Sequence, residues 1–229
     1  MLNETITVCD VHVSSASVCM PPTPAYSMTN VASTVPEVSV CIITFKRPRM
    51  LAALLEELAR QESDGLFSIS IVVVDNDREE SARETVIAAK RTLLTPVSYD
   101  VEREQNLSLA RNRSVRNATG EYVAFIDDDE VPAPRWLVTL YQMLLGSGVD
   151  GVLGPVYPKF EVEPPKWLTR SRVAERLHGG GELPTGRVLN WQETRSGNVL
   201  LKRKIFDEPG NLFDPKFGSH GEDHDFFGG

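Results

Sequence analysis

Two uninterrupted runs of apolar, mostly β-branched residues constrain the fold of this chain more than any other feature. The first run is VSVCIIT at 38–44, and the second is ISIVVVD at 69–75. Runs of this kind are typical of strands that are covered on both faces, as in a parallel sheet. Between them Pro48 suits the first turn of a helix, and apolar residues follow at the spacing of one helix face: Leu51, Leu54, Leu55, Leu58 and Ala59. Strand, helix and strand in this order predict a right-handed βαβ unit.

The same alternation continues along the chain as far as Trp136. The next expected elements are a helix near 79–92, a strand near 97–103, a short helix near 108–118 and the strand YVAFI at 122–126. Alternating strands and helices predict an α/β fold with a mostly parallel, doubly wound sheet. Beyond Trp136 the pattern weakens, and we expect a less regular half with a helix to about Leu145 and strands near 151–157 and 196–203.

Residues 1–36 differ in character from the rest of the chain. They mix Ser, Thr, Pro and Val without useful periodicity, and Pro21, Pro22 and Pro24 interrupt what pattern there is. The sequence therefore predicts a poorly ordered extension at 1–36 and a single domain at 37–229.

Charge and cysteine content exclude some classes of partner. The net charge is −8 and the pI is about 5.1, whereas binding of a nucleic-acid polymer needs clustered Lys and Arg. Cys9, Cys19 and Cys41 are an odd number without C-x-x-C spacing, which favours a reducing compartment. No apolar run approaches the roughly 18 residues of a membrane span. We expect a cytoplasmic protein that is at most peripheral at the inner face of the plasma membrane.

Polar residues follow three of the expected strands at the point where each strand ends. They are Thr44 after the first strand, Asp75 with Asp77 after the second, and Asp127 to Asp129 after YVAFI. In doubly wound sheets, ligands bind outside the carboxyl ends of the strands. The sequence therefore predicts a ligand site at this edge of the sheet.

The acidic run Asp127-Asp128-Asp129 is the strongest candidate within that site. Consecutive carboxylates repel one another unless a cation or solvent screens them. If the segment stays extended, Asp127 and Asp129 point one way and Asp128 the other, which suits Mg²⁺ or Mn²⁺ bound jointly with a substrate phosphate. Glu130 is then a bystander. The alternative is a solvated acidic turn that caps a helix starting after Pro132.

A second acidic motif, FGSHGEDHDFFGG, lies near the end of the sequence. It places Glu222, Asp223 and Asp225 among glycines, together with His220 and His224. A carboxylate in such a loop can act as a general base. Two other interpretations stay open, namely a second metal site that uses the histidines and an ordinary polar surface loop.

The expected helix before the acidic strand carries three arginines, Arg111, Arg113 and Arg116. A guanidinium can bind phosphate with two hydrogen bonds. Arg111 is nearest to the helix start, and therefore to the strand ends, so it is the preferred candidate for a diphosphate contact.

Other features are less informative about function. The three tryptophans are expected to pack in the core or loops rather than to stack on a sugar, and they are Trp136, Trp167 and Trp191. The sequence contains no P-loop, G-x-G-x-x-G or G-x-S-x-G motif, which argues against ATPases, dehydrogenases and hydrolases of those types.

Taken in order, the motifs resemble glycosyltransferase family 2, a group of inverting enzymes with the GT-A fold. The segments that carry the resemblance span about residues 37–229 and are VSVCIITFKRP, ISIVVVDND, NLSLARNRSVRNATGEYVAFIDDDEVPAPRWL, SGNVLLKRKIF and LFDPKFGSHGEDHDFF. Within the family the chain is most similar in character to bacterial exopolysaccharide glucosyltransferases of the succinoglycan type. The family pattern usually continues beyond the last segment, so we expect that the domain is truncated at its C-terminus.

The resemblance implies a role for each candidate residue. It points to Thr44, Phe45, Asp75 and Asp77 for the base and ribose of the donor. It makes Asp127 and Asp129 the D-x-D motif that binds the metal, with Asp127 also near the donor and Asp128 a secondary donor contact. It puts Arg111 near the diphosphate. It implies that Asp223 of the Glu222-Asp223 pair is the catalytic base.

The implied activity is metal-dependent transfer of a sugar, with inversion, from a nucleotide-sugar. A UDP-sugar is the expected donor, and a hydroxyl of a glycan or lipid-linked oligosaccharide is the expected acceptor, in bacterial cell-surface polysaccharide synthesis. One alternative is a donor-binding module that is catalytically silent. A phosphatase of the haloacid dehalogenase type fits poorly, because its D-x-D motif lies on the first strand, whereas this one lies on about the fourth and precedes Glu130.

Overall fold

A computed structural model describes residues 6–8, 35–157, 187–188, 196–208 and 210–218. The first half of the sheet is built from strands β2 (Glu37–Thr44), β3 (Ser68–Asp75), β4 (Val97–Val101) and β5 (Tyr122–Phe125). All neighbouring pairs among these four strands are parallel, in the order β4-β3-β2-β5. The prediction of a mostly parallel α/β sheet is confirmed for this half.

The other half of the sheet is shorter and mixed in direction. It is formed by β8 (Val199–Lys202), β6 (Gly151–Leu153), β1 (Ile6–Val8) and β7 (Arg187–Val188). Strand β8 runs antiparallel to both β5 and β6, and β7 runs antiparallel to β1. The eight-stranded sheet therefore passes from regular and parallel to short and mixed, as the weaker pattern beyond Trp136 indicated.

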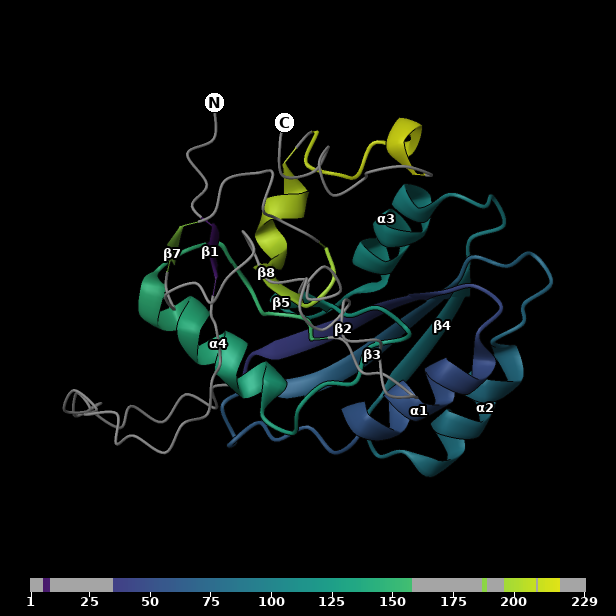
Figure 1. Cartoon of the computed structure of the whole chain (residues 1–229), viewed down its shortest axis with the longest axis horizontal. Helices are drawn as coiled ribbons and strands as arrows, with labels where there is room; N and C mark the ends of the chain where they lie inside the picture. The colour runs from purple at the N-terminus through teal and green to yellow at the C-terminus, as the bar shows by residue number, and fades with distance from the viewer. Residues whose placement is uncertain (1–5, 9–34, 158–186, 189–195, 209, 219–229) are drawn as a thin grey trace, which may run out of the picture.

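Four helices cover the two faces of the sheet (Figure 1). They are α1 (Pro48–Leu58), α2 (Arg83–Thr92), α3 (Leu107–Asn117) and α4 (Trp136–Ser147). The buried leucines of α1 share one apolar cluster with residues of α2, α4 and Val38, Val40 and Ile42 of β2. Helix α3 packs on the opposite face, in a cluster with Cys41. Side chains of β2 thus alternate between two apolar layers, which explains its uninterrupted apolar sequence.

Cys41 is part of this packing. It is fully buried, and burial raises the pKa of its thiol to about 12. The thiol therefore stays protonated at neutral pH and packs as a small apolar side chain.

Some element boundaries differ from the predictions. The helix expected near 79–92 begins only at Arg83, because Asp75 accepts a hydrogen bond from the main-chain N–H of Ala82 and folds the preceding residues into a loop. The strand expected near 151–157 ends at Leu153.

Ile6–Val8 belong to the segment 1–36, for which the sequence predicts a poorly ordered extension. These residues form β1, in parallel register with Gly151–Leu153. Three residues are too few to show a periodicity, and the pairing is made by main-chain groups, so the sequence pattern carries no sign of it. The rest of the segment up to residue 34 lies outside the described residues.

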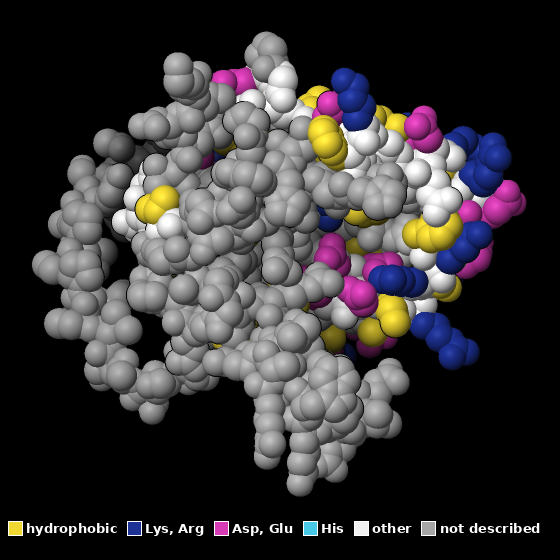
Figure 2. Space-filling view, turned by 45° about the horizontal axis from the view of Figure 1, so that its top comes forward, with side chains coloured by type: hydrophobic (Ala, Val, Ile, Leu, Met, Phe, Trp, Pro, Cys, Tyr) yellow, Lys and Arg dark blue, Asp and Glu magenta, His cyan; other side chains and the backbone are white. Residues whose placement is uncertain are grey.

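Charged side chains of both signs lie interspersed over the described part of the face in Figure 2. None of the helices among the residues placed by the structure is long and apolar enough to span a bilayer.

Candidate functional site

The carboxyl ends of β2, β3 and β5 meet at one edge of the sheet. Thr44 is in register with Asp75, and the Asn76 N–H donates to the Thr44 carbonyl at 2.8 Å. The Thr44 hydroxyl donates to Oδ2 of Asp128, also at 2.8 Å. The structure therefore brings together the three polar strand ends that the sequence singled out.

The acidic run lies in a turn rather than in an extended segment. Strand β5 ends at Phe125, and the Glu130 N–H donates to the Asp127 carbonyl at 3.1 Å. Asp128 is buried, whereas the side chains of Asp127 and Asp129 are 39% and 50% exposed. The two flanking carboxylates are therefore the ones open to a ligand.

The predicted alternation of side chains along this run is wrong. Asp128 and Asp129 both reach Nη1 of Arg47, at 3.0 and 3.1 Å, whereas Asp127 lies 3.8 Å from Nη2 of Arg111. Alternation requires the pleat of a strand, and the turn removes it.

Arg47 is a site residue that the sequence interpretation missed. It is the residue before Pro48 at the start of α1, and its side chain is 51% exposed. Hydrogen bonding and the negative charge of Asp128 raise the pKa of the guanidinium. The only signal in the sequence was a basic residue directly after a polar strand end.

Phe45 lies beside Arg47 in the chain, between the strand end and α1. Its ring is 37% exposed, and Nζ of Lys46 lies 5.1 Å from the ring centroid. A partly exposed aromatic face at this edge is available to stack on a planar ligand group.

Arg111 is buried at the same edge, as its position near the start of α3 predicted. Its side chain is 5% exposed, and its guanidinium lies 5.6 Å from the Phe213 ring centroid as well as near Asp127. A buried guanidinium needs anionic or polar partners, and Asp127 supplies a negative charge at one end of it. The other two candidates differ, since Arg113 pairs with Asp100 and Glu102 and Arg116 is exposed.

Asp75 holds a loop. It is fully buried and accepts hydrogen bonds from Asp77 N–H at 3.0 Å, from Ala82 N–H at 2.7 Å and from the Tyr99 hydroxyl at 3.0 Å. Burial, followed by the charge of Asp75, raises the pKa of Tyr99. Asp77 is also buried and accepts from Glu79 N–H at 3.2 Å. The acceptors of Asp75 are therefore directed at the protein's own donors.

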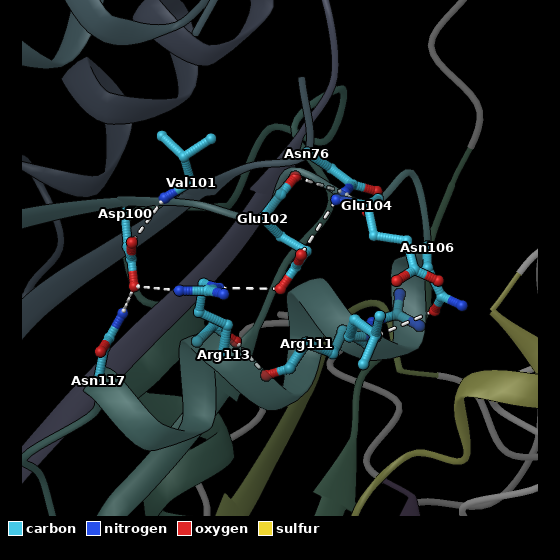
Figure 3. Close-up of polar contacts among 11 residues, drawn as sticks. Asn76, Asp100, Val101, Glu102, Glu104, Asn106, Arg111, Arg113 and Asn117 are labelled. Carbon is cyan, nitrogen blue, oxygen red and sulfur yellow. Dashed lines mark hydrogen bonds and ion pairs between the residues drawn. The ribbon is translucent and has the colours of Figure 1, made fainter. Parts of the chain in front are cut away.

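The loop after β4 is tied to the same edge (Figure 3). The side-chain amide of Asn76 donates to the carbonyls of Glu102 and Glu104, at 3.0 and 2.6 Å. Arg113 on α3 lies between Asp100 and Glu102, as Figure 3 shows. These contacts fix the start of α3, and with it Arg111, relative to β3.

Helix α3 also holds the segment that leads towards the second acidic motif. Asn112 exchanges two hydrogen bonds with the main chain of Phe213, at 2.7 and 2.9 Å. Asn106 donates to the Pro215 carbonyl at 2.8 Å, and Leu107 N–H donates to the Gly218 carbonyl at 3.0 Å. From Ser219 onwards the motif lies outside the described residues, including Glu222, Asp223, His220 and His224, as do Trp167 and Trp191.

The carboxylates that remain can be tested against the needs of a metal ion. Over the described ranges, no group of three or more His, Cys, Asp and Glu side chains is arranged to hold a metal. Mg²⁺ and Mn²⁺ in phosphate sites use only one or two protein carboxylates and take other ligands from substrate and water. Gly197 leaves space beside Asp127, since a Cβ there would lie 3.0 Å from Oδ2. Asp127, 39% exposed and with room beside it, is compatible with an ion held jointly with a phosphate, whereas Asp129, 50% exposed, lies beside Arg47.

The sequence matches the family model for Glycosyl transferase family 2 over residues 39–210. It is 33% identical over 196 residues to the succinoglycan biosynthesis protein ExoM of Rhizobium meliloti (strain 1021), covering 84% of this chain and 60% of the relative. It is 27% identical over 195 residues to the glucosyl-dolichyl phosphate glucuronosyltransferase of Haloferax volcanii, covering 82% of this chain and 58% of the relative. The chain thus spans 60% or less of the length of these curated relatives.

Solved structures agree with this match at the level of the fold. Staphylococcus aureus TarS 1-349 superposes with a TM-score of 0.62 at 16% identity, over 83% of this chain and 55% of that one. The mannosyltransferase PcManGT of Pyrobaculum calidifontis gives 0.57 at 20% identity, over 92% of this chain and 54% of that one. The resemblance inferred from the ordered motifs is confirmed: the chain belongs to glycosyl transferase family 2 and has the GT-A fold.

Proposed function

We propose that this chain is a metal-dependent, inverting glycosyltransferase that uses a nucleotide-sugar donor, with a UDP-sugar as the expected one. The observation that carries the proposal is the pair of half-exposed carboxylates, Asp127 and Asp129, each beside an arginine at the carboxyl edge of the sheet. Carboxylates recruit a divalent ion and arginines bind phosphate, so together they suit a diphosphate.

Asp127 and Asp129 are the residues that would hold the ion. The chemistry supplied by a bound ion is stabilisation of the negative charge that develops on the departing nucleoside diphosphate. Arg47 and Arg111 add positive charge on either side of the same turn, where it would stabilise the charge of a departing diphosphate.

Thr44, Phe45 and Asp77 are proposed to contact the base and ribose. The partly exposed ring of Phe45 suits stacking, and Thr44 sets the place of Asp128 through its hydroxyl. Asp75 is proposed to act on the donor only through the loop that carries Asp77. Asp128 likewise holds Arg47 in position, rather than contacting the donor directly.

The ligands of the structural neighbours support this donor class. TarS 1-349 has been solved in complex with UDP and with UDP-GlcNAc, and PcManGT in complex with GDP-Man and Mn²⁺. At 15–20% sequence identity these neighbours share the fold with this chain, and their donors are the basis for proposing a nucleotide-sugar here. The match to ExoM is the basis for proposing an acceptor hydroxyl on a glycan or lipid-linked oligosaccharide, in bacterial surface polysaccharide synthesis at the inner face of the membrane.

Asp223 is proposed as the base that removes the acceptor proton, with Glu222 beside it. Asp223 lies five positions after Gly218 in the sequence, and the segment that ends at Gly218 is held by α3 through Asn106 and Asn112. This anchoring supports the proposal, because a base has to lie within hydrogen-bond reach of the acceptor hydroxyl.

Thermal unfolding with a panel of nucleoside diphosphate sugars, with and without Mn²⁺, tests the donor assignment. We expect one nucleotide to raise the melting temperature, and Mn²⁺ to enlarge the shift, since a ligand that binds only the native state stabilises it by mass action. Transfer and donor hydrolysis are then assayed for the wild type and for Asp223→Asn. Metal-enhanced binding without transfer or hydrolysis by the wild type would favour the catalytically silent module. Near-normal transfer by Asp223→Asn would remove the base assignment.

A further inference from the structure

Asn198, directly before β8, has a left-handed main-chain conformation, which asparagine adopts more readily than most other non-glycine residues. Its φ is 54°, in the left-handed region, and its side chain is 9% exposed. Such a conformation persists where the surroundings of the residue hold it. The contacts of Asn198 therefore indicate which role this conformation serves.

The side-chain amide of Asn198 joins three elements. Its Oδ1 accepts from Nε1 of Trp136, the first residue of α4, at 2.6 Å. Its Nδ2 donates to the carbonyl of Pro155 at 2.7 Å, and its own carbonyl accepts from Gly154 N–H at 2.8 Å. A Cβ on Gly154 would lie 2.6 Å from Nδ2, so the approach leaves no room for a side chain there. Asn198 thus fixes the start of β8 against α4 and the end of β6.

The neighbouring Gly197 faces the acidic turn. A Cβ added to Gly197 would lie 3.0 Å from Oδ2 of Asp127 and 3.5 Å from Oε1 of Glu130. Gly197 is not among the glycines with positive φ, so its conformation is open to other residues. What favours glycine at this position is therefore the space that Asp127 needs, and not a special backbone angle.

We propose that Asn198 is a positioning residue of the donor site. We also propose that the main chain of Gly197, beside Asp127, restricts the position of the Asp127 carboxylate. The amide of Asn198 holds the turn Ser196–Asn198 at a set distance from Asp127, and the missing side chain of Gly197 keeps Oδ2 accessible to a cation. Strand β8 thereby contributes to a site whose other residues come from β2, β5 and α3. The inference rests on the proposed function, because it assigns Asp127 to metal-assisted nucleotide binding.

The direct test is Gly197→Ala, with Gly146→Ala as the matched control. Gly146 lies on α4 with nothing within 4 Å of an added Cβ, so the control adds the same methyl group away from the site. The affinity for UDP is measured by calorimetry at several Mn²⁺ concentrations and without metal, together with the melting temperature. We expect Gly197→Ala to weaken the Mn²⁺-dependent component about tenfold, the lower end of the effect of disturbing residues around a metal ligand. Metal-free affinity should match that of the control. The melting temperature of Gly197→Ala should match that of the wild type, because Gly146→Ala itself favours helix α4 and is expected to raise the melting temperature.

The role of Asn198 is tested with Asn198→Gly and Trp136→Phe. Asn198→Gly accepts the left-handed φ but lacks the amide, whereas Trp136→Phe removes one donor and leaves the bond to Pro155. We expect both variants to need more Mn²⁺ for half-maximal UDP binding, Asn198→Gly more than Trp136→Phe, and saturating Mn²⁺ to restore binding. A purely structural role would instead lower metal-free and metal-dependent binding alike, with no rescue by added metal, and would overturn the proposal.

UDP binding by the wild-type protein distinguishes a failure of the positioning role from a failure of the proposed function. If it binds UDP with a clear Mn²⁺ dependence and Gly197→Ala does the same with unchanged affinity, the positioning role is overturned and the proposed function stands. If the wild type binds UDP without any Mn²⁺ dependence, both are overturned.

Discussion

The carboxyl ends of β3 and β5 carry the same Asp-x-Asp pattern, as Asp75-Asn76-Asp77 and Asp127-Asp128-Asp129. After β3, the first aspartate is fully buried and accepts three hydrogen bonds from the protein. After β5, the middle aspartate is buried, and the two flanking carboxylates are 39% and 50% exposed beside arginines. One copy of the pattern shapes a loop, and the other presents charge to the outside.

The direction of the donors explains this difference. Main-chain N–H groups of Asp77 and Ala82 converge on Asp75, because the chain after β3 folds back over the strand end. After β5 the chain makes a turn closed by Glu130. The guanidinium groups of Arg47 and Arg111 lie beside Asp129 and Asp127, and the Thr44 hydroxyl donates to Asp128. Main-chain donors hold one fixed geometry, whereas long arginine side chains can exchange a carboxylate for a phosphate. Exposure and donor type, rather than the pattern itself, separate a structural carboxylate from one that binds ligand.

The largest expected effect is on activity, from Asp129→Ala. We expect transfer to fall about a hundredfold or more, because metal-assisted stabilisation of the leaving group contributes several kilocalories per mole. Stability should change little, because an exposed ion pair such as Asp129–Arg47 contributes only about 0–1 kcal/mol. Glu62→Ala is a matched control, since Glu62 is equally exposed and also pairs with an arginine. Full activity of Asp129→Ala with normal metal-dependent nucleotide binding would contradict the metal-binding role proposed for the carboxylates after β5.

The next effect is on stability, from Asp75→Ala. We expect the free energy of unfolding to fall by about 3 kcal/mol, because three donors lose a buried, charged acceptor. Urea unfolding of Asp75→Ala, Asp75→Asn and wild type measures this, with Asp75→Asn intermediate since it keeps one oxygen. If Asp75→Ala keeps wild-type stability but loses nucleotide binding, Asp75 contacts the ligand. The aspartates after β3 and β5 would then serve the same purpose.

The parallel half of the fold could be predicted closely from the sequence, and the mixed half could not. Strands β2 and β3 are buried on both faces, so their sequences are almost entirely apolar and can be recognised as strands. Strands β1 and β7 have three and two residues and pair with partners far along the chain, so no local pattern marks them. Short strands of this kind are specified by main-chain pairing and by the elements around them.

The candidate site shows the same division. Strand ends predicted the edge at which Thr44, Asp127 and Arg111 meet, because parallel strands end together. The sequence did not separate Asp75 from Asp127, since the same residue type can accept from main-chain N–H groups or face a ligand. It also missed Arg47, whose partners are 81 and 82 positions away in the chain.

Tyr99→Phe tests the structural role of Asp75 after β3 with a smaller change, because it removes only one of the three hydrogen bonds to Asp75. Removing the hydroxyl should cost about 1 kcal/mol of stability at neutral pH, and UDP affinity should be unchanged. Burial, and then the charge of Asp75, raise the pKa of Tyr99 in the folded protein, so the neutral form is favoured there. Its contribution is therefore fully present below the pKa of an unfolded tyrosine, about 10, and is lost as pH rises through the folded value. Urea unfolding of both proteins at pH 7 and above pH 10 checks this, and an equal difference at both pH values would contradict it.

The smallest effect comes from a carboxylate at neither strand end, which provides the reference for an ordinary ion pair. Asp150, before β6, accepts a hydrogen bond from Lys202 at 3.0 Å and lies 3.3 Å from Lys204. The hydrogen bond from Lys202, opposed by burial and helped by Lys204, lowers the pKa of Asp150. Asp150→Asn should cost about 0.5 kcal/mol at pH 7. Because the folded pKa is lowered, this contribution is present above the unfolded value of about 3.9 and is lost as pH falls through the folded one. Urea unfolding at pH 7 and pH 3 measures the difference. If Asp129→Ala costs no more stability than Asp150→Asn while its activity falls, the carboxylates after β5 serve the ligand and not the fold.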